Sequence, residues 1–108
     1  MSRIVYLFLA FFLAAGISLA APKEKGFVGN ISDDMCGLKH MMPGQSDKDC
    51  TLECVKGGSK FVLADVAKQK VYKLSDQEKP RAFAGQKVKV TGTLQGDTIQ
   101  VSSITAVQ

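Results

Sequence analysis

The sequence predicts a mainly β fold with one short helix: a small five-stranded OB-like barrel whose first strand is followed by a Cys/His loop-helix insertion. Three observations predict this fold. Five short segments alternate apolar and polar residues, one segment carries the start and stop signals of a helix, and a polar connection separates the third strand from the fourth. An open antiparallel sheet with the helix packed on one face is the alternative architecture.

The N-terminal segment, residues 1–20, predicts a signal peptide rather than a part of the fold. Arg3 provides a positive charge, residues 4–15 form an almost unbroken apolar run, and Ser18-Leu19-Ala20 supplies small residues at the positions that a signal peptidase reads. The run is shorter than the roughly 20 residues of a membrane span, and no cysteine stands at the cleavage point for lipid attachment. We therefore expect a periplasmic or secreted protein without a membrane anchor.

The exported chain is long enough for one small domain, which we expect over residues 26–108 after a disordered lead-in at residues 21–25. Residues 26–32 alternate apolar and polar side chains and predict the first strand. A helix of about ten residues is then expected to start at Ser46 or Asp47, because Ser46-x-x-Asp49 approximates a capping box. Gly57-Gly58 predicts its end.

Four further strands are predicted by alternating segments at residues 60–67, 70–74, 87–94 and 98–107. Lys68-Gln69 is expected to form a tight turn, and residues 75–85 to contain a short helical turn with Phe83 packed inward. On the fourth strand the alternation predicts four inward-facing residues: Val88, Val90, Gly92 and Leu94. The change of phase at Ser102-Ser103 predicts a β-bulge in the last strand.

All three cysteines and the only histidine lie in the predicted insertion, as Cys36-x3-His40 and Cys50-x3-Cys54. On a helix, the i,i+4 spacing of Cys50 and Cys54 places both thiols on one face, with Cβ atoms about 5–6 Å apart. This exceeds the roughly 3.5–4.5 Å of a disulfide, so a bond between these two is disfavoured. Two thiolates on successive turns can instead converge on one metal ion.

A metal site is the first interpretation of this pattern, with Cys36, His40, Cys50 and Cys54 as a Cys3His ligand set of the kind that binds zinc. The neighbouring methionines favour copper(I) as the alternative metal, since thioethers are soft ligands: Met35, Met41 and Met42. The adjacent acids Asp33 and Asp34 are interpreted as an Asx-type turn rather than as a metal pair.

A structural disulfide is the competing interpretation, because cysteines of exported proteins tend to pair. Cys36 bonded to Cys50 or Cys54 would join the loop to the helix and leave one thiol over. Redox chemistry is a third alternative, since the helix dipole favours the thiolate of Cys50 near the helix N-terminus. The absence of a CxxC pair from the sequence weighs against a disulfide oxidoreductase.

Four stretches of this chain resemble a family of small exported bacterial proteins of unknown function: GNISDDMCGLKHM, DKDCTLECVKGGSKFVLAD, KVYKL and AGQKVKVTGTLQGDTIQVSSI. The resemblance covers nearly all of the chain beyond the predicted signal peptide. It implies an OB-like β domain with a Cys/His-containing insertion after the first strand. It implies no activity, because no activity is established for that family.

Composition and motifs disfavour two function classes. The sequence has one histidine, no phosphate-binding glycine loop and no acid pair at a defined spacing, so we expect no enzymatic activity. A net charge of +4, part of it on the predicted signal peptide, is too small to indicate nucleic-acid binding. Three aromatic residues alternate with aliphatic ones as core side chains do: Phe27, Phe61 and Tyr72. The remaining expectations are a soft-metal-binding domain or a disulfide-stapled binding module, a monomer with an exported partner in either case.

Overall fold

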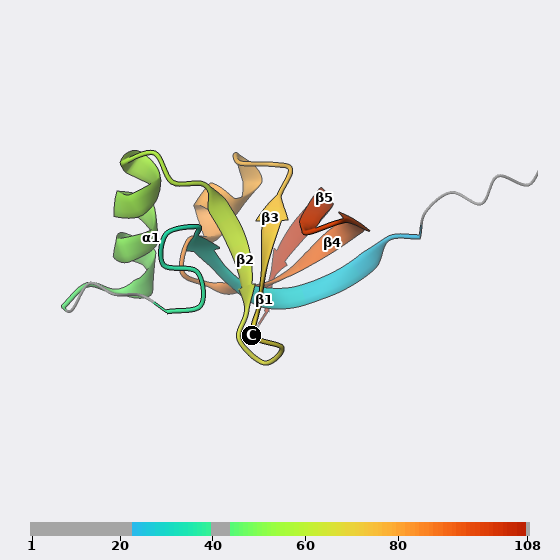
Figure 1. Cartoon of the computed structure of the whole chain (residues 1–108), viewed down its shortest axis with the longest axis horizontal. Coiled ribbons are helices and arrows are strands. Elements are labelled where there is room, and N and C mark those ends of the chain that lie inside the picture. The colour runs from blue at the N-terminus through green and yellow to red at the C-terminus, as the bar shows by residue number, and fades with distance from the viewer. Residues whose placement is uncertain (1–22, 40–43, 108) are drawn as a thin grey trace, which may run out of the picture.

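The computed structural model describes residues 23–39 and 44–107. The predicted signal peptide, residues 21–22 of the predicted lead-in and His40 lie outside these ranges, and Lys25 at the end of that lead-in is the first residue of β1. Seven elements follow along the chain (Figure 1): β1 (Lys25–Asp33), α1 (Asp47–Lys56), β2 (Phe61–Asp65), β3 (Lys70–Leu74), the 3-10 helix η2 (Lys79–Phe83), β4 (Lys87–Gln95) and β5 (Thr98–Ala106). The prediction of a mainly β fold with one short α-helix is confirmed.

The five strands form one sheet that closes into a ring in the order β1-β2-β3-β5-β4, with β4 pairing back onto β1. The β3–β5 pair is parallel and every other pair is antiparallel. Closure removes exposed sheet edges, which would otherwise be sites for association with another chain. The alternative prediction of an open antiparallel sheet is therefore wrong.

β1 belongs to both halves of the ring. Its first part pairs with β4 and its last part with β2, and Asn30 is the residue that pairs with both Ala64 and Lys87. A Cβ atom added to the preceding Gly29 would stand 2.6 Å from the Ala64 carbonyl oxygen, so glycine permits this close approach of β1 and β2. The end of β1 is thereby brought to the side of the sheet where α1 lies (Figure 1).

The apolar side chains that were expected to face inward form the core. Its most deeply buried members come from β1, β2, β4 and β5, and include Ile31, Phe61, Leu63, Val88, Val90 and Ile99. Phe27 packs on Tyr72 with ring centroids 5.4 Å apart, as core aromatics do. The expectation for Leu94 is wrong: it is 41% exposed, because it lies at the end of β4 beside the turn to β5.

One detail of the strands agrees with the sequence-based prediction and one does not. The register of β4 and β5 shifts between Thr91 and Gly92, which leaves Ser102 as the extra residue, so the predicted bulge is confirmed. The second strand ends two residues earlier than predicted, at Asp65. The reason is local, since the Asp65 carboxylate accepts a hydrogen bond from the Lys68 backbone N–H and starts the turn.

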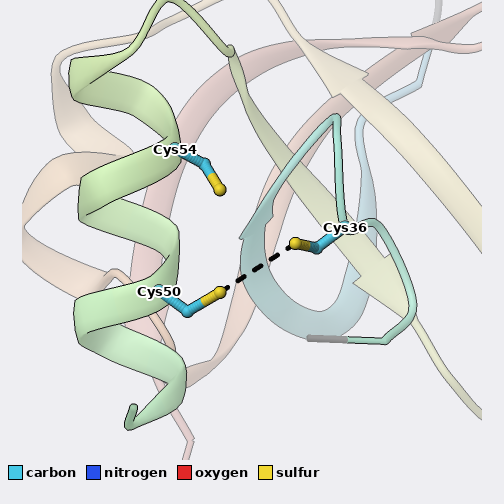
Figure 2. Close-up of side chains that lie close together, drawn as sticks. All are labelled: Cys36, Cys50 and Cys54. Atoms are coloured by element: carbon cyan, nitrogen blue, oxygen red, sulfur yellow. Dashed lines mark hydrogen bonds between the residues drawn. The ribbon is translucent and has the colours of Figure 1, made fainter. Parts of the chain in front are cut away.

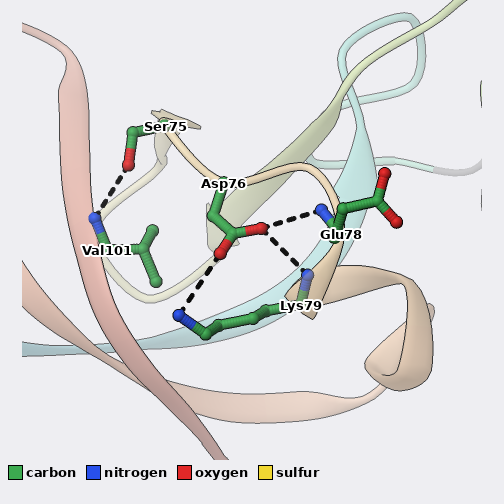
Figure 3. A network of polar contacts seen from close by, with 5 residues as sticks. All are labelled: Ser75, Asp76, Glu78, Lys79 and Val101. Atoms are coloured by element: carbon green, nitrogen blue, oxygen red, sulfur yellow. Dashed lines mark hydrogen bonds and ion pairs between the residues drawn. The ribbon is translucent and has the colours of Figure 1, made fainter.

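The connection from β3 to β4 contains the expected helical turn, η2, whose first turn is held by a carboxylate (Figure 3). Asp76 Oδ1 accepts hydrogen bonds from the backbone N–H groups of Lys79 and Glu78, and these bonds lower the pKa of the Asp76 carboxyl. Ser75 Oγ accepts from Val101 N at 2.9 Å and ties the connection to β5. The side chains of Asp76 and Ser75 thus hold the two ends of the connection before η2 in place.

α1 has the predicted bounds and caps. Ser46 Oγ accepts the backbone N–H of Asp49 at 3.1 Å, and Gly57 ends the helix with its N–H on carbonyls of the last turn. The helix start packs directly on Gly85, which has a φ of +74° and whose added Cβ would stand 2.4 Å from Lys48 N. None of the helices in residues 23–39 and 44–107 is long and apolar enough to cross a membrane.

Candidate metal centre

The three cysteines come together between α1 and the loop that follows β1. Cys50 and Cys54 project from successive turns of the helix toward Cys36 on the loop (Figure 2). Cys50 is fully buried and the other two are half-buried. The i,i+4 geometry expected from the spacing is thus confirmed, and the loop does fold back onto the helix.

The loop that carries Cys36 is held by hydrogen bonds from the end of β1. Asp33 Oδ2 accepts from the backbone N–H groups of Met35, at 3.1 Å, and Cys36, at 3.0 Å. Ser32 Oγ donates to the Gly37 carbonyl at 2.8 Å, and the Gly37 N–H donates to the Asp33 carbonyl at 2.8 Å. The predicted Asx-type turn is confirmed at Asp33, and it fixes where Cys36 points.

The sulfur separations fit a shared metal ion better than a disulfide. All three Sγ atoms lie within 4.8 Å of one another, and Cys36 Sγ is 3.9 Å from Cys50 Sγ. A disulfide requires about 2.05 Å, so these cysteines are not bonded to each other in this structure. Thiolates about 2.3 Å from a tetrahedral zinc ion are about 3.8 Å apart, which is close to the Cys36–Cys50 separation.

The thiol of Cys54 has a raised pKa. Burial is the largest cause, and together with the nearby Asp33 carboxylate and the Cys36 thiol it raises the pKa of this thiol from 9.0 to about 12. A metal ion must therefore displace a proton from Cys54 on binding, as at any thiolate site. The same shift works against Cys54 as a redox nucleophile at neutral pH.

Asp33 also lies beside the thiol centre, which its interpretation as a turn residue did not predict. Its side chain is fully buried, and its Oδ1 has no hydrogen-bond partner among the described residues. The signal in the sequence was the position of an acid directly after a core strand and three residues before Cys36. A second acid beside it, Asp34, is exposed and accepts the backbone N–H of Lys60 at 3.2 Å.

The other predicted ligands are either exposed or outside the described residues. His40, Met41 and Met42 lie in the 40–43 stretch that the structure does not describe, so the prediction of His40 as the fourth ligand stays a prediction. Met35 is 76% exposed, whereas the three thiols are buried or half-buried. The part of the copper argument that rested on Met35 is thus not supported.

Residues 55–107 match a family model described as "Protein of unknown function (DUF5818)". This stretch is a little under half of the chain and holds β2 to β5, so the similarity covers most of the sheet. It begins one residue after Cys54, which leaves the three cysteines outside the matched part. Among curated proteins no match was found. Nor does a solved structure match the chain.

Proposed function

We propose that this protein is a small exported OB-like domain that binds one soft metal ion, zinc or copper, through the thiolates of Cys36, Cys50 and Cys54. The observation that carries the proposal is the convergence of three sulfur atoms within 4.8 Å from two separate elements. Helical spacing alone brings only Cys50 and Cys54 together. The third sulfur arrives through the turn at Asp33, which holds Cys36 against the helix.

The ligand set favours zinc over copper as the resident ion. Three thiolates with one nitrogen or oxygen ligand make a closed tetrahedral zinc site, which typically has a structural role. The sequence-based prediction assigns the fourth position to His40. Copper(I) also accepts three thiolates, but its further support from thioethers is reduced by the exposure of Met35.

The OB-like assignment is supported by the strand order. Five strands close in the order β1-β2-β3-β5-β4, and a long curved first strand is shared between both halves, as in small OB barrels. The proposal places the metal centre in the insertion after β1, where it fastens α1 to the sheet. A small domain of this kind gains folding stability from a bound metal.

Export and the absence of catalysis are parts of the same proposal, and both rest on sequence. The apolar run and the small residues at 18–20 support a cleaved signal peptide and a periplasmic or secreted location. The single histidine and the lack of a catalytic motif support a binding protein, a monomer with a partner in the exported space, rather than an enzyme. Neither nucleic acid nor a membrane is proposed as a partner.

A disulfide-stapled binding module is the second candidate, and one observation favours it. Cys36 and Cys50 are in hydrogen-bond contact, with sulfurs 3.9 Å apart, so oxidation would join this pair first. Cys54 would then remain as a single thiol. The two candidates differ in metal content and in the number of thiols that can be alkylated.

Elemental analysis of the purified full-length protein and of single cysteine-to-serine variants tests the proposal. We expect about one zinc or copper per chain in the parent and a loss of most of it in Cys36→Ser, Cys50→Ser and Cys54→Ser. Met35→Leu is the matched control, because it removes an exposed soft donor from the same loop and should leave the metal content unchanged. Metal-free parent protein with a single alkylatable thiol would refute the metal site and support the disulfide.

A further inference from the structure

The carboxylate of Asp33 is a buried polar group with half of its hydrogen-bonding capacity unused. The residue is fully buried at the end of β1, and Oδ1 has no hydrogen-bond partner in the described part of the chain. No described basic side chain forms an ion pair with it. Buried charges are normally paired or bound to a metal, since an uncompensated one is costly.

The orientation of this carboxylate is fixed by its other oxygen. Both N–H groups of the turn, from Met35 and Cys36, donate to Oδ2. Oδ1 is left without such a bond. Asp33 thus borders the thiol cluster, through its hydrogen bond with the Cys36 backbone and through its closeness to the Cys54 thiol.

We propose that Asp33 is the fourth ligand of the thiolate centre and binds the metal ion through Oδ1. This inference rests on the proposed function and assigns the open position to a residue of β1 rather than to His40. Carboxylate oxygen is an accepted zinc ligand at about 2.0–2.2 Å. Oδ2 keeps its two backbone hydrogen bonds and acts as the outer support that orients the ligand.

The charge balance of this site can be stated. Each ligating thiol releases its proton to solvent, and three thiolates with one carboxylate around a divalent zinc ion leave a formal charge of −2. Cys50 lies in the first turns of α1, where the helix dipole stabilises negative charge. The bound cation would offset most of the negative charge that Asp33 and the three thiolates bring to the site, and the helix dipole would stabilise part of the remainder.

Asp33→Asn is the discriminating variant, because asparagine keeps an oxygen that can accept from the Met35 and Cys36 N–H groups. Asp34→Asn is the matched control: it makes the same substitution at the adjacent, exposed acid. His40→Ala tests the rival ligand. Zinc affinity of the full chain is measured by competition with a chromophoric chelator, cobalt(II) spectra report the coordination, and circular dichroism in chelator checks the fold.

We expect Asp33→Asn to weaken zinc binding by more than about 100-fold, beyond the loss typical of an outer-shell partner. Asp34→Asn and His40→Ala should bind as the parent does, and only Asp33→Asn should change the cobalt spectrum. A loss below about 100-fold in a folded Asp33→Asn variant would overturn the assignment. A parent that binds no zinc or copper would instead refute the proposed function itself.

X-ray absorption spectroscopy of the zinc-loaded parent keeps the assignment testable if Asp33→Asn does not fold. Asp33 ligation predicts three sulfur neighbours at about 2.3 Å and one oxygen at about 2.0–2.2 Å. The outer-shell scattering that an imidazole ring produces should be absent. Imidazole scattering, or a first shell of sulfur alone, would overturn the proposal.

Discussion

At Gly85, the addition of a single methyl group should push the start of α1 away from the sheet. Its φ of +74° lies in the left-handed region, and a Cβ added there would stand 2.4 Å from Lys48 N and 2.7 Å from Lys48 Cα. The left-handed backbone costs alanine about 1–2 kcal/mol relative to glycine. The overlap adds about 1–3 kcal/mol, because both atoms are backbone and the start of α1 must move.

Gly85→Ala should therefore lower the free energy of unfolding by about 2–5 kcal/mol, the sum of these two costs. In a domain of this size that lowers Tm by about 10 °C or more. The assay is thermal and urea unfolding of the metal-free protein, followed by circular dichroism. Since Cys50 follows Lys48 on the same helix, the variant should also weaken metal retention.

Gly96→Ala is the control that isolates the helix contact. Gly96 has a φ of +60°, but no atom lies within 4 Å of its added Cβ, so only the backbone cost of about 1–2 kcal/mol applies. Its metal content should equal that of the parent. Equal destabilisation of the two variants would contradict the view that α1 is seated on Gly85.

Three shorter predictions concern α1 and its cysteines. Ser46→Ala removes the side-chain acceptor for Asp49 N and should cost about 1 kcal/mol in urea unfolding, whereas an unchanged midpoint would contradict the cap. In metal-free protein at pH 8, the raised pKa of Cys54, about 12, should make its alkylation about 30- to 100-fold slower than in the unfolded chain; equal rates would contradict it. Mild oxidation of metal-free protein should join Cys36 to Cys50, as peptide mapping would show, and a Cys50–Cys54 product would contradict the geometry.

Much of the fold was predictable because its signals are local. Alternation placed the strands, Ser46 and Gly57 marked the ends of the helix, and the phase change located the bulge at Ser102. Leu94 was misplaced because alternation gives the face of a strand but not where the core ends. The closure of β4 onto β1 depends on pairing between distant residues, which no local pattern encodes.

The thiol centre was predictable only where local spacing determines it. Helical spacing identified Cys50 and Cys54 as neighbours, while the approach of Cys36 depends on a turn whose geometry only the structure supplies. Asp33 was recognised as a turn residue, and its Oδ2 does form the turn. Its second oxygen could not be assigned from the sequence, because burial without a partner is a property of the packed fold.

Native mass spectrometry of protein purified without chelators tests the central claim most directly. The metal-site account predicts one zinc or copper ion per chain, removable by acid and chelator, and three alkylatable cysteines after removal: Cys36, Cys50 and Cys54. A metal-free chain lighter by the two hydrogens of a disulfide, with a single alkylatable cysteine, would contradict it.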